Sequence, residues 1–148
     1  MNRSTSLACL SSVIVGLFIL FAMQSIVAGY TGKEITIKLG NAQSAPVNGT
    51  ANHRIIVNVS YSVSDPTLIG QKINAVMKVH LSNGSIIKTT SFPSGFIANK
   101  TDTAELLTNI PKSYAQNITT ETVFTDLNKT NILSNIVKTQ PVLSGSIK

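Results

Sequence analysis

The chain has 148 residues, a net charge of +6 and one cysteine, Cys9, a length that suits a single domain of ordinary size. Because Cys9 lies in an apolar N-terminal segment, residues 29–148 hold no disulfide, no thiolate nucleophile and no cysteine-based metal site, which excludes a blue-copper centre. The lysines are spread evenly and Arg54 is the only arginine after residue 28. Nucleic-acid sites cluster their basic residues and favour arginine, so we interpret these lysines as a solvated surface and expect no nucleic-acid partner.

Residues 1–28 have the order of a secretory signal peptide. Arg3 precedes an apolar run that is purest over residues 13–23, and Ala28 follows as a small residue suited to cleavage. The alternative is a retained anchor, because residues 7–28 would form a helix of about 33 Å, enough to span the hydrocarbon core of a membrane. Either interpretation predicts one N-terminal hydrophobic helix and places residues 29–148 outside the cytoplasm, at the cell envelope or in the extracellular space.

The exported part, residues 29–148, begins with three segments whose apolar residues alternate with polar ones. This period of two is typical of half-buried antiparallel strands. The pattern predicts strands over residues 34–39, 55–63 and 73–81. The side chains predicted to face the core are Ile35, Ile37, Leu39, Ile55, Val57, Val59, Tyr61, Val63, Ile73, Ala75, Met77, Val79 and Leu81. Asn74, Lys78 and His80 are expected on the solvent face.

Three further strands are predicted over residues 104–110, 117–125 and 132–143, with Phe124 in the core and Pro141 placing the end of the last strand at a sheet edge. The segments between the strands, such as SDPTLIG, FPSG and DLNKT, are rich in turn-forming residues. Six or seven short strands without a helical period favour an all-β antiparallel sandwich, with a β-barrel as the alternative.

Residues 54–142 resemble a known class of β-sandwich domain in the order of their strands and turns. The stretch INAVMKVHLSNGSIIKTTSF, followed by TDTAELLTNIPKSY and ITTETVFTD, resembles the central hairpin and last strands of an immunoglobulin-like or fibronectin-III-like domain. The Ile110-Pro111 step and Tyr114 stand where such domains often place a strand end and the next strand's opening tyrosine. The resemblance implies a tyrosine corner at Tyr114 and an Ig-like fold for residues 29–148. It implies no single function, since the fold serves many.

The exported part contains six Asn-x-Ser/Thr triplets without proline in the middle, the acceptor motif for N-linked glycans. They begin at Asn48, Asn58, Asn83, Asn99, Asn117 and Asn128. Composition alone can produce such triplets in a chain rich in Asn, Ser and Thr, so either some are glycosylated or all are incidental. Asn83 carries a second signal, because Asn83-Gly84 fits a two-residue hairpin turn that needs positive φ at both positions. A turn and a glycan are compatible at Asn83.

Residues suited to catalysis are sparse. The exported part has two histidines, His53 and His80, which we expect at the surface rather than in a shared metal site. Its six carboxylates are scattered, and no nucleophile elbow, phosphate loop or zinc-protease motif is present. We therefore predict a protein that is not an enzyme and that needs no cofactor.

These features predict an exported cell-surface protein with a structural or binding role in an envelope layer, a filament or an adhesive contact. The lack of disulfides suits a bacterial or archaeal, in particular an archaeal, surface protein. The alternative is an accessory subunit of a membrane protein complex, held by residues 7–28 if these are not cleaved. Other protein subunits are the expected partners. The segment Tyr30–Leu39 either pairs within its own domain or adds as a strand to a neighbouring subunit.

Overall fold

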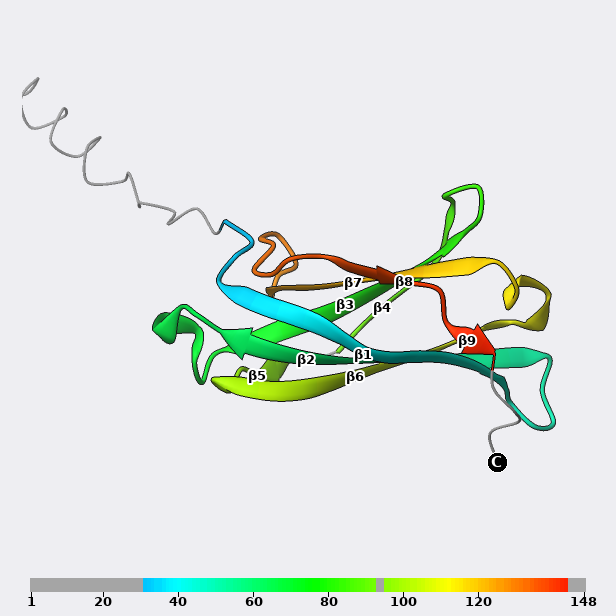
Figure 1. The fold of residues 1–148 in the computed structure, drawn as a ribbon, viewed down its shortest axis with the longest axis horizontal. Coiled ribbons are helices and arrows are strands. Elements are labelled where there is room, and N and C mark those ends of the chain that lie inside the picture. The colour runs from blue at the N-terminus through cyan, green and yellow to red at the C-terminus, as the bar shows by residue number, and fades with distance from the viewer. Residues whose placement is uncertain (1–30, 93–94, 144–148) are drawn as a thin grey trace, which may run out of the picture.

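A computed structural model describes residues 31–92 and 95–143, which form two β-sheets packed face to face (Figure 1). The strands are β1 (Ile35–Pro46), β2 (Asn52–Val63), β3 (Lys72–Leu81), β4 (Ile86–Ser91), β5 (Phe96–Ile97), β6 (Thr101–Pro111), β7 (Ile118–Asp126), β8 (Val137–Thr139) and β9 (Val142–Leu143). Single 3₁₀ turns lie at Pro66–Leu68 and Lys112–Tyr114. The predicted all-β sandwich is confirmed, whereas the predicted N-terminal helix and signal or anchor lie outside the described residues.

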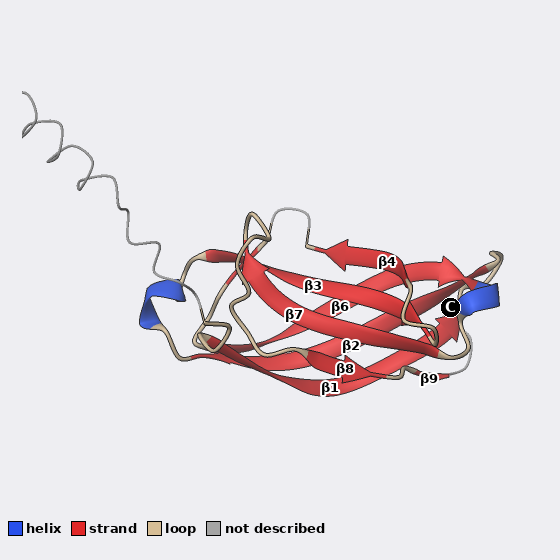
Figure 2. Cartoon of the chain, turned by 90° about the horizontal axis from the view of Figure 1, so that it is seen from above, coloured by secondary structure: helices blue, strands red, loops and turns tan. Residues whose placement is uncertain are grey.

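The two sheets have the strand orders β6-β2-β1-β9 and β4-β3-β7-β8, with β5 paired to the start of β3. All pairs are antiparallel except β1 with β9. Figure 2 shows the long, twisted strands of the two sheets lying over one another. Because β1 pairs along its length with β2 of the same chain, residues 35–39 form an ordinary strand of their own domain. Their addition to a neighbouring subunit is not tested by a single chain and stays a prediction.

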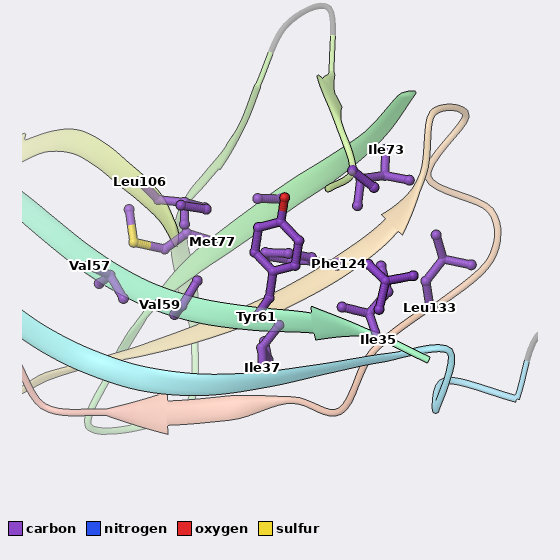
Figure 3. Close-up of a cluster of buried hydrophobic side chains, with 14 of the residues drawn as sticks. Ile35, Ile37, Val57, Val59, Tyr61, Ile73, Met77, Leu106, Phe124 and Leu133 are labelled. Carbon is purple, nitrogen blue, oxygen red and sulfur yellow. The ribbon is translucent and has the colours of Figure 1, made fainter. Parts of the chain in front are cut away.

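The core lies between the sheets and is formed mainly by the alternating positions of β1, β2, β3, β6 and β7 (Figure 3). Among the residues predicted to face the core, Val57, Val59, Val79 and Phe124 are buried, and Leu81 is partly buried against them. The ring of Tyr61 stacks edge-on to Phe124 at a centroid distance of 5.2 Å, which adds directional packing to the apolar contact. The period-two pattern of these strands therefore places the core correctly.

Strand β1 departs from the predicted alternation after Ile37. Leu39 is 39% exposed, although the pattern places it on the core face. The register with β2 shifts between Leu39 and Asn41, so an extra residue bulges there. Gly40 permits the bulge because a Cβ at this position would lie 3.2 Å from the carbonyl oxygen of Asn58. Beyond the bulge the alternation restarts one residue out of phase, so that Ala42 and Ser44 lie opposite the buried residues Val57 and Ile55.

Asn74 in β3 is more buried than the simple alternation predicts. It lies on the outer face of its sheet as predicted, but it is only 1% exposed. Its Nδ2 donates to the backbone oxygens of Leu127 at 2.8 Å and Asp126 at 3.4 Å, because the chain after β7 folds over this part of the sheet. A buried amide with satisfied donors anchors that loop.

The predicted last strand, residues 132–143, is divided between the two sheets. Residues before Pro141 form β8 beside β7, and residues after it form β9 beside β1. Pro141 removes a backbone donor and breaks the strand at the crossing, and β9 lies at a sheet edge as predicted. The Asn135 side chain accepts from Ile37 N–H at 2.8 Å and donates to Ile37 O at 3.0 Å, as a neighbouring strand would. This side of the sandwich is thereby closed.

The tyrosine corner implied at Tyr114 does not form. Tyr114 does lie in the turn that connects β6 with β7, but its side chain is 43% exposed. Its hydroxyl makes no hydrogen bond to any residue that the structure describes. The turn is held instead by the backbone bond from Ala115 N–H to Lys112 O at 3.1 Å.

Candidate functional site: the open edge of strand β6

Strand β6 forms the edge of its sheet on the side opposite to β9. Val63 N–H donates to Lys100 O, and Lys112 N–H donates to Ala51 O, each at 2.8 Å. Hydrogen-bonded and non-bonded pairs alternate along an antiparallel ladder, and the register between β2 and β6 is continuous. The even-numbered residues of β6 therefore direct their backbone groups toward β2. The odd-numbered residues direct theirs toward the open edge.

Two features of β6 agree with this assignment. Thr103 N–H donates a hydrogen bond to the Asp102 carboxylate at 2.8 Å and not to a carbonyl of β2. Pro111, which has no N–H to offer, stands at an outward position, where proline is tolerated in an edge strand. Asp102 blocks one outward donor, so Glu105, Leu107 and Asn109 are the positions that present backbone donors and acceptors to a partner.

An apolar groove of about 280 Å³ runs along this edge, between β6 and β4 of the facing sheet. It is lined by Thr90, Ser91, Phe92, Glu105, Leu106 and Leu107. Leu107 is 48% exposed at its rim, and Phe92 packs partly against the core. The bond between the hydroxyls of Thr90 and Thr108, 2.8 Å long, joins the two edge strands across the sandwich. The groove thus combines an apolar surface with unpaired backbone.

Most carboxylates of the described residues are engaged in local structure. Glu34 accepts from Thr31 N–H, Asp65 caps the turn at Pro66–Leu68, and Asp102 accepts from Asn99 Nδ2 at 2.6 Å. Asp126 organises the loop that follows β7. Glu121 lies 3.2 Å from Lys138 Nζ and 3.8 Å from Lys78 Nζ. Glu105, in the groove, is the one carboxylate with no ion pair or hydrogen bond to a described residue.

The hydrogen bonds in the loop after β7 predict how the stability of the fold depends on pH. Burial by itself raises the pKa of Asp126, but hydrogen bonds from Thr130 and Asn131 outweigh it and hold the pKa below its ordinary value. A carboxyl group with a lowered folded-state pKa stabilises the fold above its unfolded pKa, and that stability is lost as the pH falls through the folded pKa. We expect the free energy of unfolding to decline below about pH 4 and to decline less in Asp126→Asn, as measured by urea denaturation. An unchanged pH dependence in the variant would contradict this role of Asp126.

The two histidines lie in different environments. His53 was expected at the surface, but it is 8% exposed, because β2 begins earlier than predicted and His53 shares the inward face of Ile55. Its Nδ1 lies 3.2 Å from the Ser44 hydroxyl. His80 lies on the outer face of the other sheet, with Nε2 4.0 Å from Glu121 Oε2. Within residues 31–92 and 95–143 no three potential ligands among His, Cys, Asp and Glu gather as a metal site would need.

The six candidate glycosylation asparagines lie at the surface, five exposed and Asn58 half-buried. One end of the sandwich contains the turn of the β3–β4 hairpin and the end of the described chain at β9, and we call it the hairpin end (Figure 1). Asn48, Asn83 and Asn117 lie in loops at the hairpin end. Asn99 and Asn128 lie in loops at the opposite end. Asn58 lies in the middle of β2, where it pairs with Asn41 on one side and Glu105 on the other.

The turn at Asn83-Gly84 differs from the predicted two-residue hairpin. Only Gly84 has a positive φ, +84°. Gly84 N–H donates to Leu81 O, and Leu81 N–H donates to Ser85 O, both at 2.9 Å. This is a three-residue loop in which a turn is followed by a left-handed glycine. Asn83 contributes through its side chain, because its Oδ1 accepts from Ser85 N–H at 3.0 Å.

Comparison of the sequence with known proteins finds no matching family model and no similar curated protein. In the described part of the chain, no helix is long and apolar enough to cross a membrane.

Proposed function

We propose that the protein is an exported prokaryotic cell-surface module with an Ig-like fold, that it carries N-linked glycan, and that it has a structural or binding role. It acts by accepting an extended strand of another protein subunit at the open edge of β6. The observation that carries this proposal is the run of outward-facing backbone groups at Glu105, Leu107 and Asn109, beside an apolar groove. Strand addition of this kind obtains affinity from backbone hydrogen bonds and specificity from alternate side chains.

The strand orders support the Ig-like assignment. In immunoglobulin-like sandwiches one sheet contains strands A, B and E, and the other contains C, F and G. The order β6-β2-β1 corresponds to E-B-A, and β4-β3-β7-β8 corresponds to C′-C-F-G. This correspondence agrees with the resemblance that the sequence carries over residues 54–142.

The partner strand that fits best carries an apolar side chain next to a basic one. The apolar residue would cover Leu107 and the groove floor at Leu106 and Phe92. A lysine or arginine one or two residues away would reach Glu105, whose carboxylate has no ion pair within the described residues. An unpaired carboxylate beside an apolar groove favours a basic partner by direct charge complementarity.

The engagement of the other carboxylates supports a role without catalysis. A general acid or base must have a carboxyl group or imidazole within reach of a bound substrate. Glu34, Asp65 and Asp126 accept hydrogen bonds that define their own turns and loops. Their positions are accounted for by local structure alone.

Site-specific crosslinking in the producing cells tests the proposal. A photoreactive residue at Leu107 of the full chain should give an adduct with a partner protein. The same residue at Ile97, which is also exposed but lies on β5 away from the groove, should not. The crosslinked partner peptide should be extended and should contain a basic residue.

A backbone variant separates strand addition from contact by side chains alone. Asn109→Pro removes an outward N–H without removing a ladder bond to β2, so the fold should persist. We expect the adduct at position 107 to fall at least fivefold in this variant. Equal adducts at positions 107 and 97, or an adduct unaffected by the proline, would contradict strand addition.

A further inference from the structure

The six Asn-x-Ser/Thr triplets are not equivalent as glycan acceptors in the folded domain. Transfer forms a bond between C1 of a lipid-linked oligosaccharide and Nδ2 of the asparagine, while the bond from C1 to the lipid phosphate breaks. The lipid phosphate leaves with the bonding electron pair, and Nδ2 gives up one proton to a base of the transferase. Nδ2 carries two N–H groups, so a short hydrogen bond to the fold does not block transfer by itself, but it fixes the side chain against the domain and opposes its entry into the transferase. The triplet's hydroxyl must also be accessible to the enzyme.

Two of the asparagines use Nδ2 to hold the fold. Asn58 Nδ2 donates to Asn41 Oδ1 at 2.6 Å, beside the bulge at Gly40, where it ties β2 to the irregular part of β1. Asn99 Nδ2 donates to the Asp102 carboxylate at 2.6 Å, and a bond to a charged acceptor is stronger than a neutral one. Asn58 is also held in the ladders of β1 and β6 on both sides.

In two other triplets the hydroxyl is engaged. Thr50, which completes the triplet of Asn48, donates through Oγ1 to Val47 O at 3.0 Å and accepts from Asn52 N–H at 3.2 Å. Thr130, which completes the triplet of Asn128, donates through Oγ1 to the Asp126 carboxylate at 2.7 Å. Both hydroxyls stabilise their own loops.

In the remaining two triplets, those of Asn83 and Asn117, neither Nδ2 nor the hydroxyl is engaged in a hydrogen bond to a described residue. Asn83 uses only Oδ1 within its turn, so its Nδ2 makes no hydrogen bond to a described residue, and neither does the Ser85 hydroxyl. Asn117 is exposed and has a left-handed backbone, with φ of +63°, that presents the residue at the start of β7. Its Nδ2 and the Thr119 hydroxyl are likewise unbonded among the residues described. Both triplets lie at the hairpin end.

We propose that Asn83 and Asn117 are the N-glycan acceptors of the folded domain, and that Asn58 and Asn99 are structural residues that stay unmodified. The inference rests on two parts of the proposed function, export and N-linked glycan, and not on strand addition. It also explains how the strand-binding edge stays accessible. Asn58 pairs with Glu105, so a glycan on Asn58 would project directly beside the groove. Glycans on Asn83 and Asn117 would cover the loops of the hairpin end instead.

Site-resolved mass spectrometry of the full chain purified from its native cells tests this assignment. We expect glycan on most copies at Asn83 and Asn117, and on fewer than about one copy in twenty at Asn48, Asn58, Asn99 and Asn128. Glycan at Asn58 or Asn99 equal to that at Asn83, or no glycan at Asn83 and Asn117, would overturn it. Neither outcome changes the crosslinking expected at Leu107, so this inference and strand addition fail separately.

A variant tests the physical reason. Asp102→Ala releases Asn99 Nδ2 while leaving the triplet Asn99-Lys100-Thr101 intact, so occupancy at Asn99 should rise at least fivefold. Glu105→Ala, on the same strand but without contact to Asn99, is the matched control and should leave occupancy at Asn99 unchanged. A folded Asp102→Ala protein with Asn99 still unmodified would contradict the role of the hydrogen bond.

Discussion

Val79→Asp is expected to unfold the domain at room temperature. Val79 is completely buried in β3, opposite Thr120 of β7, and belongs to the hydrophobic cluster between the sheets. A carboxylate there would lose its hydration in apolar surroundings, which costs several kcal/mol, whereas the whole domain is stable by only about 5–15 kcal/mol. Thermal and urea denaturation followed by circular dichroism measure the loss.

The matched control for Val79→Asp is Ile86→Asp. Ile86 is an exposed apolar residue at the start of the neighbouring strand β4, so the same substitution there should change stability by less than about 1 kcal/mol. A Val79→Asp protein that melts like Ile86→Asp would show that the inward face of β3 has been assigned wrongly.

The second large effect is expected at Ile37. Ile37→Ala should destabilise the domain by about 2–5 kcal/mol, because the side chain is 2% exposed and its removal leaves a cavity between the sheets. Leu39→Ala, two residues along the same strand, should cost under about 1.5 kcal/mol, because Leu39 is 39% exposed beside the bulge at Gly40. Urea denaturation of both variants gives the comparison. Equal losses would mean that β1 continues without the bulge.

Ile37 and Leu39 also show where prediction from the sequence succeeds and where it fails, because both were predicted to face the core and only Ile37 is buried. Alternation is a property of the extended backbone itself, since successive side chains point to opposite faces. It therefore identified the strands at residues 55–63 and 73–81, their core faces and the all-β class without any knowledge of their partners. The absence of a helical period and the turn-forming residues between strands gave the sandwich.

Tertiary pairing decided the rest. The bulge after Leu39 depends on the register between β1 and β2, which a pattern within one strand does not contain. Asn74 is buried because a loop from another part of the chain covers it, and residues 132–143 divide because the two sheets offer separate edges on either side of Pro141. These are contacts between residues far apart in sequence.

The candidate sites follow the same division. The sequence alone determined which six asparagines have the acceptor motif and that residues 29–148 carry few groups suited to catalysis. Only the tertiary structure decided that β6 lies at an open edge and that Glu105 lacks a partner among the described residues. It also decided that the Nδ2 atoms of Asn58 and Asn99 donate hydrogen bonds within the fold. The physical reason is that a motif specifies atoms, whereas their availability depends on which neighbours the fold brings within hydrogen-bonding distance.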